Sequence, residues 1–172
     1  MQQEFKEYLD LQNPDNLVWL DESGIDNNEH YPYGWSKVGD RAFAKRPAYP
    51  SHRMSMIAVL NKGEIKAPLI FLGTCNKQIF EEYVEKILLP EMSPGQTLIL
   101  DNAKFHTSVN LEGILSKKHC FVRYLPPYSP DMNPIEHQWF KIKNLVRKFI
   151  QAGKENFQDA ICLAFRKLGK SY

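Results

Sequence analysis

Three acidic residues have the chemical type and the placement needed for metal-dependent chemistry. Asp21 ends the apolar run "LVWLD", Asp101 ends a second run, "TLILD", and Glu136 comes just after the proline-rich stretch "LPPYSPDMNP". Carboxylate oxygens are the ligands that Mg²⁺ and Mn²⁺ prefer in proteins. Two such ions, about 3.5–4 Å apart, activate a nucleophile and stabilise the leaving oxygen of a phosphodiester. If the three acids converge, they predict a site for phosphodiester chemistry.

Each acid also has a purely structural interpretation. Asp21 and Asp101 fit turn-forming or helix-capping roles, because Asp readily bonds nearby backbone amides. Asn133, Pro134 and Glu136 fit the N-cap, first and third positions of a helix, where the glutamate closes a capping box. The residues taken alone leave both interpretations open.

The elements that must position these acids follow a mixed pattern. Apolar runs predict strands at 17–21, 97–101 and 120–125 and a hairpin across 53–73 that turns at 61–64. Helical spacing of apolar residues predicts helices at about 77–89, 107–118, 134–150 and 155–168. Residues 22–50 are expected to form a long loop with an irregular strand near 41–45. This order predicts an α/β fold with one mixed five-stranded sheet flanked by helices.

Composition and charge limit the class of protein. An apolar fraction of 43% and a charged fraction of 24% predict a globular fold, with residues 1–16 as a lead-in and 17–172 as one domain. Three widely spaced cysteines argue against a disulfide framework and a paired-cysteine zinc site. Neither a membrane span nor a signal peptide is visible, so a cytoplasmic location is expected.

The C-terminal part of the chain is basic. Residues 137–172 contain eight Lys or Arg residues against two Asp or Glu residues. Such a surplus suits a polyanionic partner such as DNA, and it equally suits a pair of solvated lysine-rich helices.

Three phrases in order carry a family resemblance: "WLDESG", "LILDNAKFH" and "LPPYSPDMNPIEHQW", with 34 residues between Asp101 and Glu136. They resemble the DDE transposases of the mariner superfamily, most closely the bacterial insertion-sequence (IS-six-thirty) branch. The resemblance runs from about Val18 to beyond Phe149, and it implies a ribonuclease H-like fold. It also implies that Asp21, Asp101 and Glu136 are the catalytic acids and hold two Mg²⁺ or Mn²⁺ ions.

The resemblance further implies cleavage and strand transfer of DNA at insertion-sequence ends, with TA as the target. Its implied partners are element ends with inverted repeats and target DNA, together with a homodimer partner. Binding would place the protein at the bacterial nucleoid. Candidate contacts to DNA phosphates are Lys104, Lys141, Lys143, Arg147 and Lys148.

Neighbouring residues have weaker assignments. Asn102, His106 and Asn133 are candidates to orient the carboxylates, against turn or helix-cap roles for the same side chains. His106 is expected to cap its helix in preference to lying near the metal. Glu22 follows Asp21 directly, and the alternation of a strand is expected to aim it the other way.

Full-length members of the family carry helix-turn-helix modules ahead of the catalytic domain. Only residues 1–16 precede the first expected strand here, so we expect the catalytic domain alone. Three explanations stay open: the downstream frame of a two-frame element, with helix-turn-helix modules on a separate N-terminal polypeptide; a degenerate copy; and a separated catalytic domain. Two other function classes stay open: another ribonuclease H-like nuclease, and a catalytically weak or inactive fragment that binds DNA or dimerises. The distances among the carboxylates of Asp21, Asp101 and Glu136 discriminate between an enzyme and a non-catalytic fragment, because an enzyme of this kind needs all three close enough to share a pair of cations.

Overall fold

The computed structural model describes residues 1–27, 53–127, 129–153 and 156–169. Its centre is one five-stranded sheet in the order β3-β2-β1-β4-β5. The strands are β1 (Leu17–Asp26), β2 (Arg53–Asn61), β3 (Glu64–Leu72), β4 (Thr97–Leu100) and β5 (Phe121–Tyr124). β1, β2 and β3 pair antiparallel, whereas β4 and β5 run parallel to β1. The predicted mixed sheet is therefore confirmed, and the irregular strand expected near residues 41–45 lies outside the described residues.

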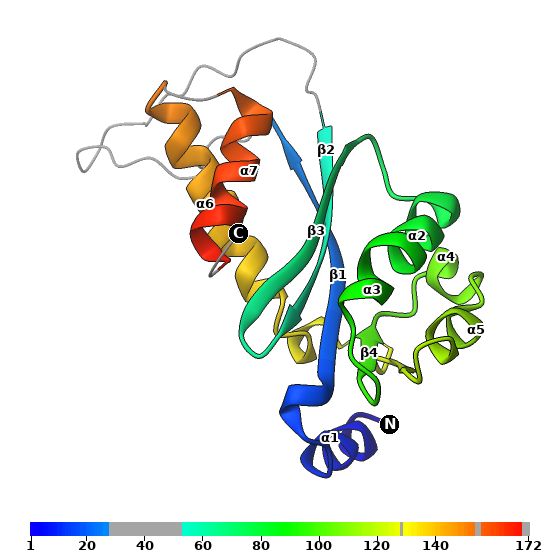
Figure 1. The fold of residues 1–172 in the computed structure, drawn as a ribbon. Coiled ribbons are helices and arrows are strands. Elements are labelled where there is room, and N and C mark those ends of the chain that lie inside the picture. Colours follow the sequence, from blue (N-terminus) through cyan, green and yellow to red (C-terminus); the bar gives the residue numbers. More distant parts are fainter. Residues whose placement is uncertain (28–52, 128, 154–155, 170–172) are drawn as a thin grey trace.

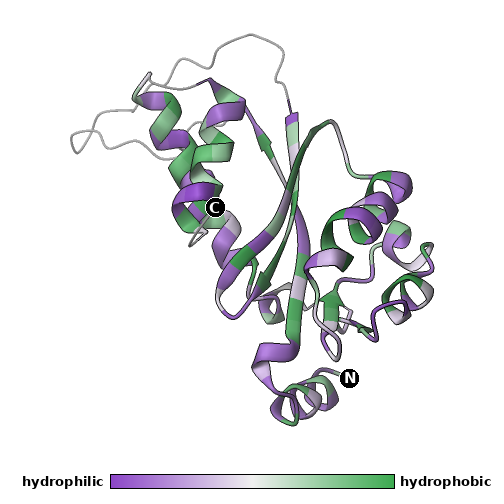
Figure 2. Ribbon diagram, in the orientation of Figure 1, coloured by the Kyte–Doolittle hydropathy of each residue, from purple (hydrophilic) through white to green (hydrophobic). Residues whose placement is uncertain are grey.

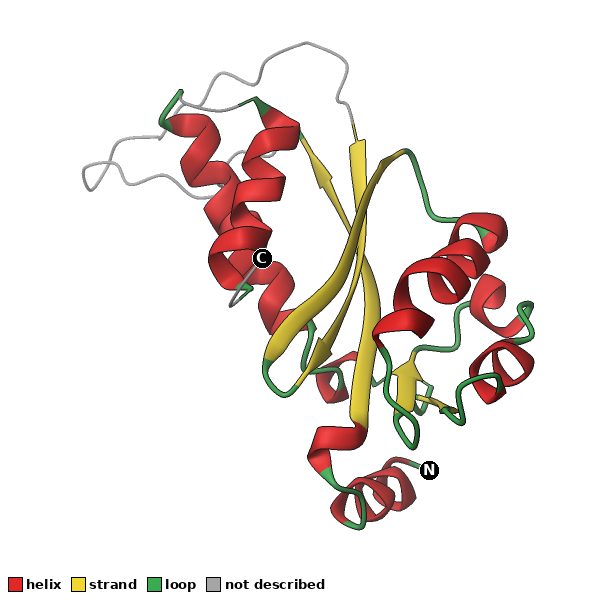
Figure 3. Cartoon of the chain, in the orientation of Figure 1, coloured by secondary structure: helices red, strands yellow, loops and turns green. Residues whose placement is uncertain are grey.

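The helices are α1 (Gln2–Asp10), η1 (Pro14–Asn16), α2 (Lys77–Tyr83), η2 (Val84–Leu88), α3 (Leu89–Glu91), α4 (Lys104–Thr107), α5 (Leu111–Ser116), η3 (Pro130–Met132), α6 (Glu136–Gln151) and α7 (Phe157–Leu168). α6 and α7 lie on one side of the sheet, the helices from α2 to α5 lie on the other, and α1 lies beyond the end of the sheet where β1 begins (Figures 1 and 3). The helix expected at 107–118 is two short helices, α4 and α5. Among the described residues, no helix is both long and apolar enough to cross a bilayer.

Two apolar cores hold the layers together. One core joins β1 and β2 to α2, η2 and α5, through buried residues such as Leu20, Phe80 and Leu115. The other joins the opposite face of β2 to α6 and α7, through residues such as Met56 and Trp139. Hydrophobic and hydrophilic residues alternate along the helices (Figure 2), because each helix turns only one stripe toward the sheet.

The β2–β3 hairpin turns where the sequence predicts it. Lys62 and Gly63 both have positive φ angles, 54° and 76°, which is the backbone of a two-residue turn that matches the twist of its strands. The hairpin is long enough for β2 to pair with β1 from Trp19 through Asp26. Consequently β1 does not end at Asp21, as the sequence suggested, but continues to Asp26.

The sheet opens at the level of Asp21. β1 pairs with β4 only over Leu17, Val18 and Trp19, and the last pair is Trp19 with Ile99. Two further steps of this register bring Asp21 level with Asp101, just where β4 has ended. Beyond this point, among the described residues, β1 has a paired neighbour only on its β2 side, which leaves room between the two aspartates.

Candidate active site

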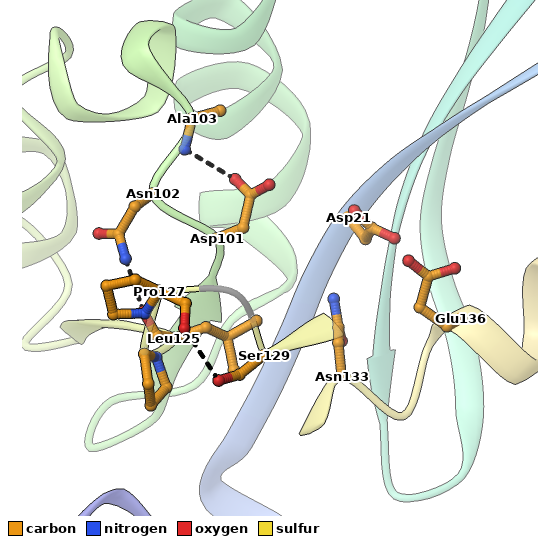
Figure 4. Close-up of a pocket in the computed structure, with 10 residues that line it drawn as sticks. Asp21, Asp101, Asn102, Ala103, Leu125, Pro127, Ser129, Asn133 and Glu136 are labelled. Atoms are coloured by element: carbon orange, nitrogen blue, oxygen red, sulfur yellow. Dashed lines mark hydrogen bonds between the residues drawn. The ribbon is translucent and has the colours of Figure 1, made fainter. Parts of the chain in front are cut away.

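The three acids singled out in the sequence line one pocket. Asp21, Asp101 and Glu136 share a cavity of about 370 Å³, whose wall is completed by Asn102, Ala103, Leu125, Pro126, Pro127, Ser129 and Asn133. The carboxylates of Asp21 and Glu136 point toward each other, and Asp101 lies across from them (Figure 4). The pocket therefore joins β1, the loop after β4, and the proline-rich segment that leads into α6.

Asp21 is held by the indole of α6. The Nε1–H group of Trp139 donates a hydrogen bond to Oδ2 of Asp21 at 3.0 Å. Burial raises the pKa of the Asp21 carboxyl to about 7, and the negative charges of Glu136 and Glu22 add to this rise. The bond from Trp139 acts in the opposite direction. Asp21 is thus a partly buried acid beside another acid, an arrangement that a bound cation would stabilise.

Asp101 is fixed by two donors on one oxygen. Its Oδ1 atom accepts from the backbone N–H of Ala103 at 3.0 Å and contacts Nδ1 of His106 at 2.7 Å. The hydrogen bond from His106 is the main cause that holds the pKa of Asp101 below its usual value, although burial opposes it. Asp101 is therefore an ionised, oriented carboxylate at the mouth of the pocket, with its side chain 55% exposed.

His106 does not take the helix-capping role that the sequence favoured. Its side chain is buried, and its second ring nitrogen, Nε2, lies 2.8 Å from Oε1 of Glu22. Burial lowers the pKa of His106, but the hydrogen bonds to Asp101 and Glu22 outweigh it and raise the pKa to about 9. Sequence reasoning missed Glu22 as part of this network, because strand alternation shows only that Glu22 and Asp21 leave β1 on opposite faces.

Glu136 is the first residue of α6, not the third. The helix has Ile135 as its N-cap residue, with no side-chain cap bond. The capping box that was the structural alternative for Asn133 and Glu136 is therefore absent, and the predicted start of the helix at Pro134 is wrong by two residues. The buried side chains of Ile135, Trp139 and Ile142 fix this end of the helix, so Glu136 is exposed on a firmly packed turn.

The two asparagines differ in what they contact. Asn102 donates from Nδ2 to the backbone oxygen of Leu125 at 2.6 Å, so it ties the loop after β4 to the segment after β5. Asn133 is 5% exposed, and its Oδ1 atom has no hydrogen-bond partner among the described residues. An unpartnered buried amide oxygen in the pocket wall is a candidate contact for a bound ion, water or substrate.

Four of the five basic candidates lie on α6. Lys141 and Lys148 are exposed and seven residues apart, whereas Lys143 and Arg147 are partly buried. Arg147 donates from Nη1 to Oδ1 of Asn144 at 3.0 Å. Lys104 is exposed at the start of α4, three residues after Asp101 in the chain. Their contact with DNA remains a prediction.

The donor set suits hard divalent cations in type. The carboxylates of Asp21, Asp101 and Glu136 and the amide oxygen of Asn133 are all oxygen donors that line the same pocket. Within the described part of the chain, however, no three His, Cys, Asp or Glu residues stand close enough to hold an ion. The acids share a pocket in this conformation without forming a closed metal cluster.

Sequence comparison connects the chain to known proteins. The family described as DDE superfamily endonuclease matches residues 16–156. The Tc1 transposase of Caenorhabditis elegans is 31% identical over 67 residues, covering 39% of this chain and 24% of that protein. The Tcb1 transposase of Caenorhabditis briggsae is 27% identical over 89 residues, covering 49% and 32%. The matches thus span between about a quarter and a third of these curated relatives.

Structural comparison identifies the fold. A pre-cleavage Mos1 transpososome aligns with a TM-score of 0.62 at 13% identity, covering 98% of this chain and 60% of the Mos1 chain. A Mos1 paired-end complex with Mg gives 0.61 at 16% identity, covering 98% and 60%. The catalytic core of BIV integrase gives 0.55 at 14% identity, covering 92% and 86%. The sheet and its helices are therefore of the ribonuclease H-like type, as the sequence predicted.

Proposed function

Because the chain belongs to the DDE superfamily endonucleases and carries a catalytic domain of the Tc1/mariner transposase type, we propose that it cleaves DNA phosphodiesters and transfers the freed strand to a target. One observation carries the proposal: Asp21, Asp101 and Glu136, from three distant parts of the chain, line a single pocket. A ribonuclease H or resolvase-like nuclease would use the same fold and the same acids. The family match favours the transposase.

We assign the three acids as the groups that bind divalent cations and orient the reacting phosphate. Mg²⁺ or Mn²⁺, when bound, supplies activation of the attacking water or hydroxyl and stabilisation of the leaving oxygen. Asp21 and Glu136 point toward each other in the pocket, where both carboxylates can bind the same cation. Asp101 approaches from the opposite side with an orientation fixed by His106 and Ala103. Mos1 structures described as containing Mg and Mn support this choice of metals.

Asn133 is proposed to accept a hydrogen bond from a water molecule, or to contact a cation, bound beside the acids. Its amide is buried next to the acids, and its Oδ1 atom has no partner among the described residues. Asn102 is proposed to act indirectly, by holding the loop of Asp101 through its bond to Leu125. Both assignments give the proline-rich segment a part in shaping the pocket, because Leu125 and Asn133 lie at its two ends.

DNA is the proposed partner, and its phosphates would be contacted by the exposed lysines of α4 and α6. Lys104, Lys141 and Lys148 are available to a polyanion, and contacts of this kind position a duplex without reading its sequence. Mos1 has been solved as a paired-end complex with a transposon end, which supports a homodimer for this protein too. Association with the bacterial nucleoid would follow from such binding.

The finer assignment rests on the sequence pattern. Glu at position 136 and the 34-residue separation from Asp101 favour the insertion-sequence branch, with inverted-repeat ends as substrate and TA as target. Helix-turn-helix modules on a separate polypeptide would supply end recognition. The matched curated relatives are nematode transposases, so the branch is the part of the proposal that an end-specific substrate must test.

The decisive test is a cleavage assay on supercoiled plasmid and on duplexes that end in candidate inverted repeats, with Mg²⁺ or Mn²⁺. Asp101→Asn is the matched variant, because it removes one charge and keeps the side-chain size. We expect metal-dependent nicking by the wild type and none by the variant. Equal activity in both proteins would refute the mechanism. DNA binding without any cleavage in either protein would instead support the inactive DNA-binding fragment.

A further inference from the structure

His106 connects two carboxylates, one on β1 and one in the loop just after β4. Its Nδ1 atom lies 2.7 Å from Oδ1 of Asp101, and its Nε2 atom lies 2.8 Å from Oε1 of Glu22. The histidine side chain is 1% exposed and the Glu22 side chain 17% exposed. Glu22 is thus a largely buried carboxylate whose side-chain partner is a histidine that also contacts Asp101. Burying an acid is costly unless it is paired.

The imidazole ring is itself firmly held. The ring centroids of Phe80 and Phe105 lie 4.3 and 4.2 Å from that of His106. With the ring packed between aromatic groups and anchored at Nε2 by Glu22, its Nδ1 atom has a fixed direction. That direction meets Oδ1 of Asp101, which also accepts the backbone N–H of Ala103.

The consequence for Asp101 is a choice of oxygen. Both donors use Oδ1, and among the described residues no donor contacts Oδ2. Asp101 stands just past the end of β4 with its side chain 55% exposed, so without these bonds its carboxylate would rotate freely. The network therefore leaves Oδ2 directed toward the pocket. Because the carboxylate is already oriented, a cation loses less binding free energy to the entropy of ordering it.

Glu22 also links the two aspartates. It is the neighbour of Asp21 on β1, and strand alternation sends the two side chains to opposite faces. Asp21 meets Trp139 of α6 on one face, whereas Glu22 meets His106 of α4 on the other. Of these two neighbouring residues of β1, Asp21 lines the pocket itself, and Glu22 contacts the histidine that orients Asp101.

We propose that Glu22 is a positioning residue of this active site, which acts through His106 to orient Asp101 for cation binding. The inference rests on the proposed function, since it assigns Asp101 to the metal site. The alternative is a purely structural role, here called a staple, in which the contact between Glu22 and His106 only holds α4 against β1. The two differ in a measurable way, because a staple affects stability but not the affinity for a cation.

The experiment compares Glu22→Ala and Glu22→Gln with the wild type in three measurements. The first is ¹⁵N NMR of the histidine ring, with His106 assigned through His106→Asn. The second is Mn²⁺ affinity from titration calorimetry, and the third is the free energy of unfolding in urea. Glu64→Ala is the control, because Glu64 is a half-buried glutamate on β3 outside the pocket.

We expect both Glu22 variants to shift the Nε2 resonance of His106. Mn²⁺ affinity should fall about 10- to 100-fold in Glu22→Ala, the range typical of residues that support a metal ligand, and less than about 10-fold in Glu22→Gln, whose amide oxygen still accepts a hydrogen bond. Glu64→Ala should leave the Mn²⁺ affinity and the His106 resonances unchanged. If Glu22→Ala does not fold, the glutamine variant carries the test alone.

Wild-type Mn²⁺ affinity in the folded Glu22 variants, despite a displaced His106 resonance, would overturn the inference in favour of the staple. An unshifted His106 resonance would overturn the geometry itself. Failure of the wild type to cleave DNA would count against the proposed function alone, because the resonance and the Mn²⁺ affinity would still report whether Glu22 orients Asp101.

Discussion

The indole N–H of Trp139 donates a hydrogen bond to Oδ2 of Asp21 over 3.0 Å, between residues 118 positions apart in the chain. This bond fastens α6 to β1 at the pocket. Because Glu136 lies three residues before Trp139 on the same helix, the bond also sets the distance between the two acids. A change at Trp139 should therefore affect stability and cation binding together.

Trp139→Phe tests this bond, since phenylalanine keeps an aromatic ring against Phe165 and removes the donor. At pH 8, where Asp21 is largely ionised, we expect the free energy of unfolding to fall by about 1.5–3 kcal/mol, the usual value for a hydrogen bond to a charged group. Urea denaturation measures it. Trp19→Phe is the matched control, because the Trp19 indole donates no hydrogen bond within the described part of the chain. Equal losses in the two variants would mean that the indole donor contributes nothing.

The pKa of Asp21 predicts a pH dependence of stability. Burial raises this pKa from 3.8 to about 7, so between these values the folded protein binds a proton that the unfolded chain has lost. The free energy of unfolding contributed by Asp21 therefore falls as the pH rises from about 4 to 7. Asp21→Asn removes this slope, and at pH 8 we expect it to be more stable than the wild type by up to about 4 kcal/mol. Urea titrations at several pH values measure the difference.

Divalent cations supply the converse test of the same residue. Because a cation binds the ionised carboxylate, Mn²⁺ should raise the melting temperature of the wild type more at pH 8 than at pH 6. Asp21→Asn should show little Mn²⁺ effect at either pH. A melting temperature of the wild type that responds equally to Mn²⁺ at both values would argue against Asp21 as a ligand.

Glu136→Gln separates catalysis from folding. Glu136 is exposed, and no side-chain bond caps its helix, so the free energy of unfolding should change by no more than about 0.5 kcal/mol. Metal-dependent cleavage should be lost, with Mn²⁺ affinity at least about tenfold lower. Asp131→Asn is the control: Asp131 is an exposed acid in η3 that does not line the pocket, and its loss should alter neither quantity. A destabilised Glu136→Gln would instead revive a capping role for this glutamate.

The sequence predicts the order of elements well because each signal is local. Continuous apolar runs mark β1 and β4, the Lys62-Gly63 turn marks the hairpin, and apolar spacings of three and four mark α6. These patterns depend on burial of one face or of both faces, which neighbours in the chain reveal. Local patterns also single out the three acids, since Asp21 and Asp101 each end an apolar run and Glu136 follows the proline-rich stretch.

Contacts between distant elements escape such reasoning. β1 continues past Asp21 because β2 pairs with it as far as Asp26, and nothing in residues 22–26 signals this. The direction of Glu22 follows from strand alternation, but its partner His106 lies 84 residues away. The start of α6 at Glu136 is likewise set by the packing of Ile135 and Trp139, which overrides the capping signal of Asn133.

The lysines of α6 give a prediction about DNA that does not depend on cleavage. Lys141 and Lys148 are exposed and two helical turns apart, so they lie on one face of α6. If each contacts a phosphate, the double variant Lys141→Gln/Lys148→Gln should reduce the slope of log K against log salt by about 1.8, since each contact contributes about 0.9. Fluorescence anisotropy with a duplex, between about 50 and 200 mM salt, measures this slope.

Lys117→Gln is the control, because Lys117 is an exposed lysine of the opposite layer that pairs with Glu85 at 2.6 Å. A salt slope that falls equally in both proteins would show that α6 has no special part in DNA binding, whereas a fall confined to the α6 variant would place the DNA backbone along the helix that carries Glu136.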